Sequence, residues 1–579
     1  MKLKYTIPTL FISILLSACM VTDLEPKEGI TDATYWRSIQ DLEYYTNGLY
    51  AINGSHGFGD TNSDNLLHQT YNKTLFDEVV IPKTADDGGW SWRTVRQCNY
   101  FLNRYHTVSA PEAKINKYVA EVTFFKAQHY FGKIKDFGDV PWYDNDLQTT
   151  DKEELYKGRD PRGLILKHII EDLEYAIEWL PEKGKEDQDR LHKDAAKSLL
   201  ARVCLHEGTF RKYNKYKDDF SAEELIRKAA DLSLEIMNTG KYKIVRGSNE
   251  GCGQIPYEGY PLHYSNLFIQ DDLWGNEEAI LAIRYIRGVS RFGHFLGFLS
   301  SQMPQRGCSK DFIESFLCVD GKPIGVSELY KGDNTFEDEI ANRDPRLYQI
   351  VDNDHKPFFI QDGQQIPSAP GFPVNIWDAV TGYRLVKFMP AKPEDQEAIQ
   401  SMFDQFAFRY AEILLIYAEA KAELGECTQT VLDKTINLLR DRVDMAHLSV
   451  NPIADPNPIN YGYNVSPLLY EIRRERRIEL VGEIVRWDDI MRWNAVKLFE
   501  NPKTMVGLRI TPDMIALDGM LSMKQTIKID GKNYLRIYID KEINDPKRKW
   551  EPNDKRYLSP LPIQELSLNP NLKQNPGWE

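Results

Sequence analysis

The stretch AEVTFFKAQHYF, residues 120–131, sets the pattern of this chain: a small residue, a bulky apolar pair a few places later, then a second small residue. The same order recurs in residues 195–201 and 411–418. Small residues let neighbouring helices approach closely, and bulky pairs fill the space between them. The pattern favours stacked, tetratricopeptide-like helix pairs, but a generic helical bundle would account for it almost as well.

Apolar residues at three- and four-residue spacing predict further helices along the chain. Most of these segments are joined by short polar links, which is typical of antiparallel helix neighbours. The expected helices cover residues 32–51, 115–134, 164–180, 194–205, 223–237, 406–424, 431–445 and 468–485.

The middle of the chain has a different composition. Residues 247–400 are rich in glycine, proline and aromatic residues, with short strand-like runs at 279–285 and 383–388. We therefore expect an N-terminal helical region (31–246), an irregular ligand-side insertion (247–400) and a C-terminal region (401–579). Loops carried on a rigid scaffold are where binding residues concentrate.

The N-terminus carries a secretion signal. Two lysines precede an apolar run, residues 7–16, which is too short to span a bilayer, and LSAC at residues 16–19 matches a bacterial lipobox. We expect residues 1–18 to be a signal peptide, Cys19 to be the lipidated N-terminus, and residues 19–30 to be a tether. The alternative is an ordinary signal peptide with an incidental cysteine at the cleavage site.

Composition argues against several partners. The formal net charge is −14 and no basic block is present to neutralise phosphates, so nucleic acid is not an expected partner. The seven cysteines form no Cys-x-x-Cys motif and do not cluster with histidines, so neither a metal site nor a cofactor is expected. Whether Cys308 and Cys318 form a disulfide is left open.

The sequence also contains no motif of a known catalytic site. There is no His-Glu-x-x-His, no Gly-x-Ser-x-Gly and no glycine-rich phosphate loop before a helix. Adjacent acids such as Asp86 and Asp87 could supply the two carboxylates of a glycosidase, but a chain with 86 acidic residues contains such pairs by chance. We expect a binding protein and not an enzyme.

Several separated segments match a known family in sequence and in order. They are residues 92–102 (WRTVRQCNYFL), 120–131, 137–141 (FGDVP), 195–208, 342–347 (NRDPRL), 409–420 (RYAEILLIYAEA), 475–480 (ERRIEL), 486–493 (RWDDIMRW), 557–562 (YLSPLP) and 569–577 (NPNLKQNPG). Together with the lipobox, these segments resemble the SusD/RagB family of nutrient-binding outer-membrane lipoproteins.

The resemblance implies a mainly α-helical, SusD-like fold: four tetratricopeptide-like helix pairs packed against an irregular, loop-rich domain with small β elements. It also implies a lipid-anchored position on the exterior of a Bacteroidetes-type outer membrane. The implied partner is a SusC-like TonB-dependent transporter, to which a captured glycan would be delivered. The alternatives are a peptide-binding, RagB-like member of the same family and a surface glycoside hydrolase.

Two stretches outside the helical stripes carry residues suited to sugar, residues 86–93 and 274–298. A sugar presents apolar C–H faces and hydroxyl groups, so its receptor needs exposed rings and planar polar groups. The candidate ligand-binding residues are Trp90, Trp92, Arg93, Trp274, Tyr285, Arg291 and Phe295. We expect the first three to form one wall of a site, with Trp274 and Tyr285 opposite, although a single ring is more often part of the core.

Acidic and basic residues lie one turn apart on the predicted helix 468–485. We expect them to form a structural ion-pair network, with direct contact to a transporter as the alternative. The residues are Glu471, Glu475, Glu479, Arg473, Arg474, Arg476 and Arg477.

Replacing Cys19 by Ala is predicted to release the protein from the membrane without unfolding it, because the acyl chains on Cys19 are the expected hydrophobic anchor. Cell fractionation measures this. Cys19→Ala protein that still sediments with outer membranes after a high-salt wash would contradict lipid anchoring.

Overall fold

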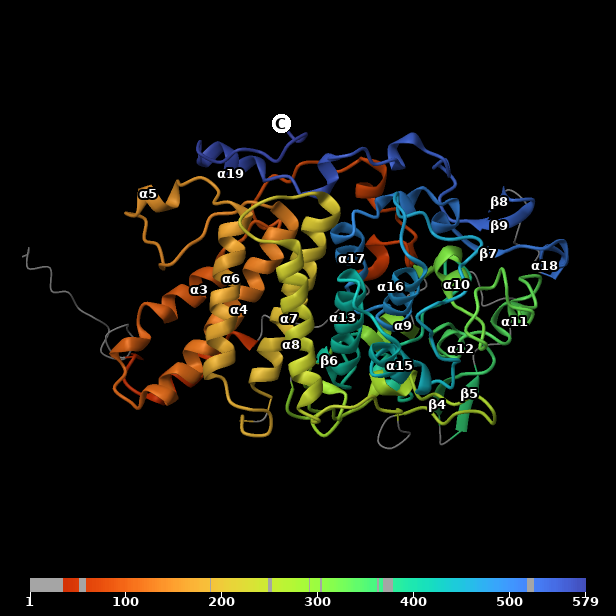
Figure 1. Cartoon of the computed structure of the whole chain (residues 1–579), viewed down its shortest axis with the longest axis horizontal. Coiled ribbons are helices and arrows are strands. Elements are labelled where there is room, and N and C mark those ends of the chain that lie inside the picture. Colours follow the sequence, from red (N-terminus) through yellow and green to blue (C-terminus); the bar gives the residue numbers. More distant parts are fainter. Residues whose placement is uncertain are drawn as a thin grey trace, which may run out of the picture.

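The structure is a computed structural model that describes residues 35–50, 59–187, 189–247, 253–290, 292–301, 305–361, 364–367, 379–517 and 525–579. A layer of long helices lies beside a region of short helices, small sheets and loops (Figure 1). Cys19, the expected signal peptide and the tether lie outside the described residues. In the part of the chain that is described, no helix is long and apolar enough to cross a membrane.

Long helices stack side by side in chain order. They are α2 (Ile39–Asn47), α3 (Arg93–Leu102), α4 (Glu112–Phe137), α6 (Arg162–Trp179), α7 (Lys193–Asn214), α8 (Ala222–Asn238), α13 (Tyr410–Glu423) and α16 (Pro467–Glu479). From α4 onward each packs on the next, so that α8 lies against α13 and α13 against α16. The mainly α-helical fold is confirmed, and this succession is compatible with tetratricopeptide-like stacking.

Small residues allow these helices to approach closely. The alanines and bulky pairs of residues 120–127, 195–201 and 411–418 are all buried. A Cβ on Gly208 of α7 would lie 2.7 Å from Cγ1 of Ile226 in α8, closer than real Cβ contacts allow. The small and bulky pattern in the sequence therefore marks the helix interfaces.

The strands form small antiparallel sheets. They are β1 (Leu66–His68), β2 (Ala279–Ile283), β3 (Arg306–Cys308), β4 (Pro357–Gln361), β5 (Gln364–Pro367), β6 (Gln405–Arg409), β7 (Val506–Arg509), β8 (Thr526–Ile529) and β9 (Lys532–Arg536). Strand β1 pairs with β3, β2 with β6, β4 with β5, and β9 with both β7 and β8. The pairing of Ala279 with Arg409 places the start of β2 beside the start of α13.

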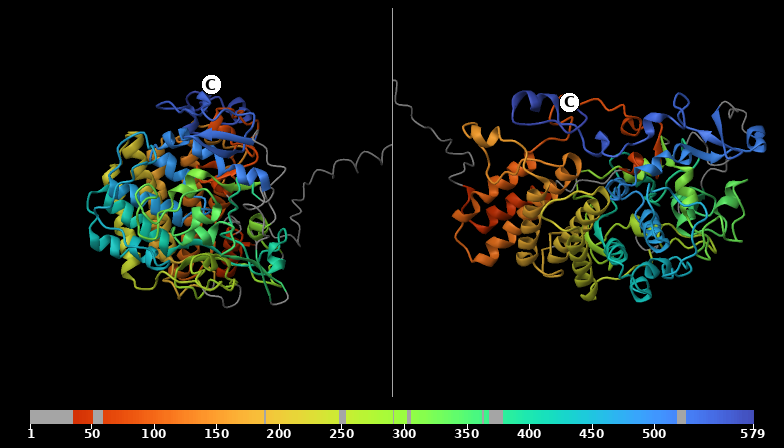
Figure 2. Two further views of the ribbon diagram at one scale, coloured as in Figure 1. Left: turned by 90° about the vertical axis from the view of Figure 1, so that its right-hand side faces the viewer. Right: turned by 45° about the horizontal axis from the view of Figure 1, so that its top comes forward.

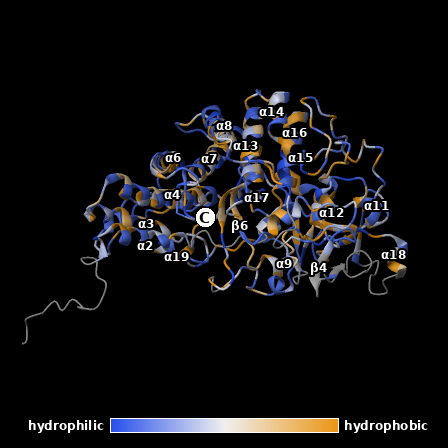
Figure 3. Cartoon of the chain, turned by 90° about the horizontal axis from the view of Figure 1, so that it is seen from below, coloured by the Kyte–Doolittle hydropathy of each residue, from blue (hydrophilic) through white to orange (hydrophobic). Residues whose placement is uncertain are grey.

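Short helices occupy the loops. They are α5 (Lys152–Leu155), α9 (Leu296–Ser301), α10 (Lys310–Ser315), α11 (Phe336–Ile340), α12 (Arg346–Ile350), α14 (Gln429–Asp433), α15 (Ile436–Asp441), α17 (Arg486–Arg492), α18 (Pro512–Leu517) and α19 (Ile563–Leu568). Seen from below, α19 lies next to α3, although the two helices are far apart in the sequence (Figure 3). In Figure 1, α19 lies along the top edge of the molecule and α3 lies lower in the helical layer. Figure 2 shows the dark blue C-terminal segment along the same edge as the orange-red segment that precedes α3.

One hydrophobic core spans both halves of the chain. It contains buried residues of α4, α6, α7 and α8 together with Phe408, Leu414 and Ile472 from the C-terminal half. A second core lies under the loops and includes Leu267, Phe312 and Leu347. The proposed boundaries at residues 247 and 400 stay a prediction.

Several predicted elements differ from the observed ones. The helix predicted over residues 406–424 begins at Tyr410, because the residues before it form β6 and pair with β2. The helix predicted over 431–445 is divided, because Thr435 leaves helical geometry at φ −134° and ψ −92°. The run 383–388 is not a strand, and within it Leu385 forms an isolated bridge to Val351.

The helix predicted to reach Val485 ends at Glu479. Gly482 and Ile484 follow with positive φ angles of 77° and 61°, which helical residues do not adopt. The N–H of Gly482 instead donates to Oδ2 of Asp60 at 2.9 Å. The turn after α16 is therefore fixed by a long-range contact that is not visible in the local sequence.

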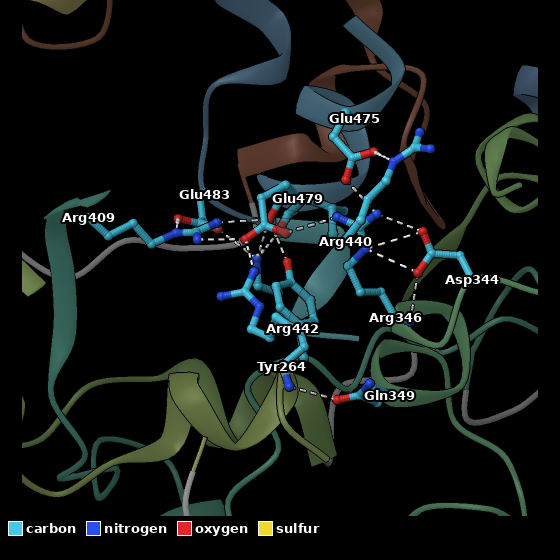
Figure 4. A network of polar contacts seen from close by, with 12 residues as sticks. Tyr264, Asp344, Arg346, Gln349, Arg409, Arg440, Arg442, Glu475, Glu479 and Glu483 are labelled. Atoms are coloured by element: carbon cyan, nitrogen blue, oxygen red, sulfur yellow. Dashed lines mark hydrogen bonds and ion pairs between the residues drawn. The ribbon is translucent and has the colours of Figure 1, made fainter. Parts of the chain in front are cut away.

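Glu479 lies at the centre of a buried network of ion pairs (Figure 4). Its carboxylate accepts from Nη1 of Arg409 at 2.7 Å and from Nη1 of Arg346 at 3.0 Å, and it is also paired with Arg442. Burial alone raises the pKa of the Glu479 carboxyl, but the three arginines outweigh burial and hold the pKa below its ordinary value. The carboxylate therefore stays charged and joins α16 to β6, α12 and the turn after α15.

The other charged residues of α16 are buried as well. Arg473 pairs with Glu423 at 3.0 Å, Arg476 with Asp489 at 2.9 Å and Arg477 with Asp311 at 2.8 Å. Since these side chains are buried in this chain, the structural interpretation of the predicted network is confirmed. Most of the pairs run between elements rather than along α16.

Replacing Glu479 by Gln is predicted to lower the free energy of unfolding by about 3–5 kcal/mol, because three guanidinium groups would remain buried around a neutral side chain. Urea denaturation measures the change. The matched control is Glu223→Gln, which removes a carboxylate from an exposed ion pair with Arg227, and should cost less than about 1 kcal/mol. A Glu479 variant as stable as this control would contradict the role of the network.

Candidate functional site

Three of the predicted ligand-binding residues line one cavity. Trp90, Trp92 and Arg93 face a space of about 580 Å³ between the start of α3, residues 141–156 and the C-terminal residues 565–572. The lining residues are Trp90, Trp92, Arg93, Val95, Arg96, Asn99, Pro141, Tyr143, Asn145, Leu147, Leu155, Tyr156, Glu565, Leu568, Asn569 and Leu572. We call this space the α3–α19 cavity.

The loop before α3 is fixed by close backbone contacts. A Cβ on Gly88 would lie 2.7 Å from ring atoms of Pro82 and Pro562, so the loop fits against the C-terminal segment only with glycine there. Gly89 has φ +69°, a left-handed conformation that favours glycine, and its carbonyl accepts from Lys133 of α4. These contacts position the two tryptophans that follow.

The two tryptophans have different environments. Trp90 is 2% exposed and its ring packs edge-on against Phe137 at a centroid distance of 4.8 Å. Trp92 is half-buried, with its ring 5.8 Å from that of Tyr130 and 5.5 Å from that of Tyr143. Trp90 therefore supports the cavity, and Trp92 is the ring better placed to contact a ligand.

The second wall of the cavity is the segment 141–156, which Asn99 and Tyr143 connect to α3 and α4. The Asn99 amide donates to the carbonyls of Tyr143 and Asn145 at 2.8 and 3.1 Å. The N–H of Tyr143 donates to the hydroxyl of Tyr130 at 2.9 Å. Burial raises the pKa of Tyr143 to about 12, so its hydroxyl stays protonated and can donate at neutral pH.

The third wall is the C-terminal helix α19 and the turn after it. The N–H of Ile563 donates to the carbonyl of Pro82 at 3.0 Å, which attaches α19 to the loop before α3. The Asn569 amide donates to the carbonyl of Lys157 at 2.9 Å, and that of Asn571 to the carbonyl of Tyr156 at 2.6 Å. Three segments far apart in sequence thus close around one cavity.

The chemistry of the lining is that of a binding site. Trp92, Tyr143 and Tyr156 supply rings, while asparagine amides and the guanidinium groups of α3 supply planar polar groups. Glu565 is the one acidic side chain among the described lining residues. Hydrolysis of a glycosidic bond ordinarily uses two carboxylates, so this lining does not provide that pair.

The other predicted residues lie elsewhere. Trp274 is 40% exposed and borders a small hollow beside Lys183 and His192, after the C-terminal end of α6. The α3–α19 cavity instead borders the segment 141–156, which precedes the N-terminal end of α6. The prediction that Trp274 and Tyr285 form the wall opposite Trp92 is therefore not supported by the geometry.

Tyr285 and Phe295 flank a loop of the middle region. The Tyr285 ring packs against His294 at a centroid distance of 4.7 Å, and the Phe295 ring is 43% exposed. Arg291 lies outside the described residues. These residues do not line the α3–α19 cavity, because no part of 274–298 is among its described lining residues.

Sequence reasoning missed several residues of the cavity. Arg96 lies three positions after Arg93, a spacing that places both on one face of a helix, so this residue could have been found. Asn99 belongs to the same recognised stretch but was not assigned to the site. Asn569 begins another stretch that matches the family and was likewise not assigned to the site. Tyr143 and Asn145 carry no local signal, because only the tertiary fold brings them to α3.

Two further cavities lie among residues that serve the fold. One of about 260 Å³ includes Arg202, Arg409 and Glu412, which are engaged in ion pairs. Another of about 230 Å³ shares Lys135 and Asp488 with the first. Since their charges already have partners in the chain, these cavities are weaker candidates than the α3–α19 cavity.

Comparison with known proteins identifies the family. Residues 277–578 match the model of the SusD family, and residues 27–205 match a SusD-like model described as starch-binding and associating with the outer membrane. The first match covers more than half of the chain. The chain belongs to the SusD family.

Relatives and solved structures extend this similarity over nearly the whole SusD-family chain. SusD-like protein P38 of Formosa agariphila is 36% identical over 83% of this chain and 89% of its own length, and SusD-like protein P2 of that organism is 24% identical over 99% and 100%. A SusD-like protein from Bacteroides fragilis has a TM-score of 0.68 at 23% identity, covering 94% of this chain and 98% of that chain. A SusD-like carbohydrate binding protein from the same species gives 0.67 at 22%, covering 93% and 100%.

The cysteines of this SusD-family protein are free thiols where they are described. Cys308 and Cys318 are both buried and unpaired, so the possible disulfide between them is not formed in the structure. No group of three or more potential ligands among the described residues is arranged to hold a metal ion.

His294, beside Tyr285, is held in its neutral form. Its Nε2 lies 2.9 Å from the carbonyl of Phe403 and donates to it, so that Nδ1 accepts from the N–H of Leu296 at 3.2 Å. Burial lowers the pKa of His294 to about 4. The unfolded chain, with a histidine pKa of about 6.5, takes up this proton first as the pH falls, so the folded protein loses stability between these two values.

Replacing His294 by Gln is predicted to reduce the acid sensitivity of the fold. Between pH 7 and 4.5, His294 should account for a loss of about 2–3 kcal/mol in the free energy of unfolding, and the variant should be spared this loss. Urea denaturation at both pH values measures the difference. His447→Gln, a change at an exposed histidine, is the control, and equal acid sensitivity in wild type and His294→Gln would contradict the prediction.

Proposed function

We propose that this protein is a cell-surface lipoprotein that captures a glycan and delivers it to a SusC-like TonB-dependent transporter. The α3–α19 cavity carries the proposal, because it joins the half-buried ring of Trp92 to Tyr143, Tyr156 and several planar polar side chains. The cavity opens to solvent beside Leu568 of α19, which is 57% exposed.

The lining fits the two chemical faces of a sugar. The apolar C–H face of a pyranose stacks on an aromatic ring, for which Trp92 is positioned, and its hydroxyl groups bond to planar amides and guanidinium groups. Tyr143 with its protonated hydroxyl can both donate and accept. Because the rings and the polar groups come from three rigidly attached segments, the site is largely preformed, which reduces the entropic cost of binding.

Family membership supports carbohydrate as the ligand. The model that matches residues 27–205 is described as starch-binding and associating with the outer membrane, and one structural neighbour is described as carbohydrate binding. The lipobox ending at Cys19 supports a lipid anchor, from which the acidic residues 20–30 would hold the body away from the lipid. We place the protein on the outer face of the outer membrane.

The alternative ligand is a peptide. The same rings and amides could bind a peptide backbone, and the family resemblance includes RagB-like members. A screen for the ligand should therefore test a pool of peptides beside the glycans. Hydrolysis is disfavoured, because Glu565 is unaccompanied by a second carboxylate among the described lining residues. We propose binding and transfer without turnover.

Replacing Trp92 by Ala is predicted to weaken binding of the recognised polysaccharide by about 1–3 kcal/mol, the usual loss for a well-placed aromatic contact. Affinity electrophoresis of the wild type against a polysaccharide panel identifies the ligand, and calorimetry then measures the variant. Trp274→Ala removes an equally large, 40% exposed ring outside the cavity and should bind as the wild type does.

A variant of the neighbouring Trp90 tests the stability of the fold, in contrast to the Trp92 variant, which tests binding. Trp90→Ala should instead lower the free energy of unfolding by about 3–5 kcal/mol, because it leaves a cavity beside Phe137. Full binding by Trp92→Ala, or loss of binding by Trp274→Ala, would remove the α3–α19 cavity from the glycan site.

A further inference from the structure

Two arginines of the α3–α19 cavity differ from the other arginines of the described chain. The side chains of Arg93 and Arg96 form no hydrogen bond, ion pair or ring contact with the described residues, whereas every other described arginine takes part in a hydrogen bond, ion pair, ring contact or electrostatic interaction. Arg93 and Arg96 are exposed, yet Arg227, which is exposed as well, is paired with Glu223 and Glu426 at 3.2 and 3.0 Å. The two unpaired guanidinium groups therefore occur together, in the lining of one cavity.

Their position on α3 is unfavourable for the helix itself. Arg93 is the first residue of α3, where the partial positive charge of the helix N-terminus repels cations, and Arg96 lies about one turn further on. No acidic residue occupies the first turn, and no side chain caps the helix. Nothing within α3 compensates these charges, but an anion in the cavity would.

The acidic residue in the cavity does not neutralise the arginines. Burial is the cause that raises the pKa of Glu565, and no ion pair joins its carboxylate to Arg93 or Arg96 in the part of the chain that is described. Two positive charges thus face one carboxylate on the opposite wall. This local excess stands out in a chain whose net charge is −14.

A buried acceptor lies on the same helix. Asn99 is fully buried and lines the cavity, and while its amide nitrogen donates to two carbonyls, its Oδ1 has no partner. An unpaired buried acceptor costs free energy until a donor reaches it. A ligand hydroxyl donating to Oδ1 would satisfy this atom.

We infer that the ligand of the α3–α19 cavity is an acidic glycan, whose carboxylate or sulfate ester binds Arg93 and Arg96 while a neighbouring hydroxyl donates to Asn99. Guanidinium groups pair with both kinds of anion through two parallel N–H···O bonds, which makes the interaction strong and directional. This inference rests on the proposed glycan-binding function and adds the charge of the sugar.

The test compares polymers that differ only in charge. The mature full-length protein, in mild detergent, is run through native gels containing polygalacturonate or its carboxyl-reduced form, and sulfated galactan or its desulfated form. The wild type should bind the acidic member of at least one pair about tenfold or more tightly than the neutral member. The carboxylate and sulfate pairs distinguish the two anions.

Variants of the two arginines assign the preference to the cavity. The double variant Arg93→Gln/Arg96→Gln should lose the preference for the acidic polymer. Its binding should also depend much less on salt concentration, because salt screens charge pairs and the variant lacks the two guanidinium groups that form them. Arg227→Gln, which removes an exposed arginine of α8, should keep both. Circular dichroism checks that the variants are folded.

The outcomes separate the inference from the proposed function. The acidic ligand is wrong if the wild type prefers no acidic polymer, or if the double variant retains the preference. If the wild type binds only neutral polymers and Trp92→Ala loses that binding, the proposed glycan capture is supported and the acidic ligand is wrong. Absence of binding to every polymer would overturn both.

Discussion

The carboxylate of Glu479, buried among three arginines, is the constraint on which the arrangement of the molecule depends. A buried charge without partners costs several kcal/mol, so α16 packs stably only where Arg346, Arg409 and Arg442 reach it together. These arginines come from α12, the end of β6 and the turn after α15. Their meeting point fixes how the loop-rich region sits against the helical layer.

A scaffold fixed in this way can carry its binding residues on irregular segments. The α3–α19 cavity has one helical wall, and its other walls are the segment 141–156 and the C-terminal residues 565–572. Side-chain amides such as that of Asn569 hold these segments by bonding to backbone carbonyls. Such bonds fix the path of these segments around the cavity.

The sequence predicted most helices because apolar spacing reports burial on one face, as in residues 120–131. It failed where partners distant in sequence decide the structure: β6 replaces the first turn of a predicted helix because β2 pairs with it. For the site, Trp90, Trp92 and Arg93 of the stretch 86–93 line one cavity, and their role in binding stays a prediction. Trp274 borders a different hollow from Trp92, because local composition does not reveal at which end of α6 a loop will pack.

The pairing of charged side chains distinguishes the interior of the protein from the α3–α19 cavity. Inside the molecule, many arginines are paired with acids, as around Glu479, and others such as Arg343 donate to backbone carbonyls, because the low-polarity interior penalises an unpaired charge. At the cavity, Arg93 and Arg96 remain unmatched at a helix end that disfavours cations. An acidic protein repels acidic polymers at a distance, so a site for them must concentrate positive charge locally. Two uncompensated guanidinium groups beside an unsatisfied buried amide oxygen form such a site.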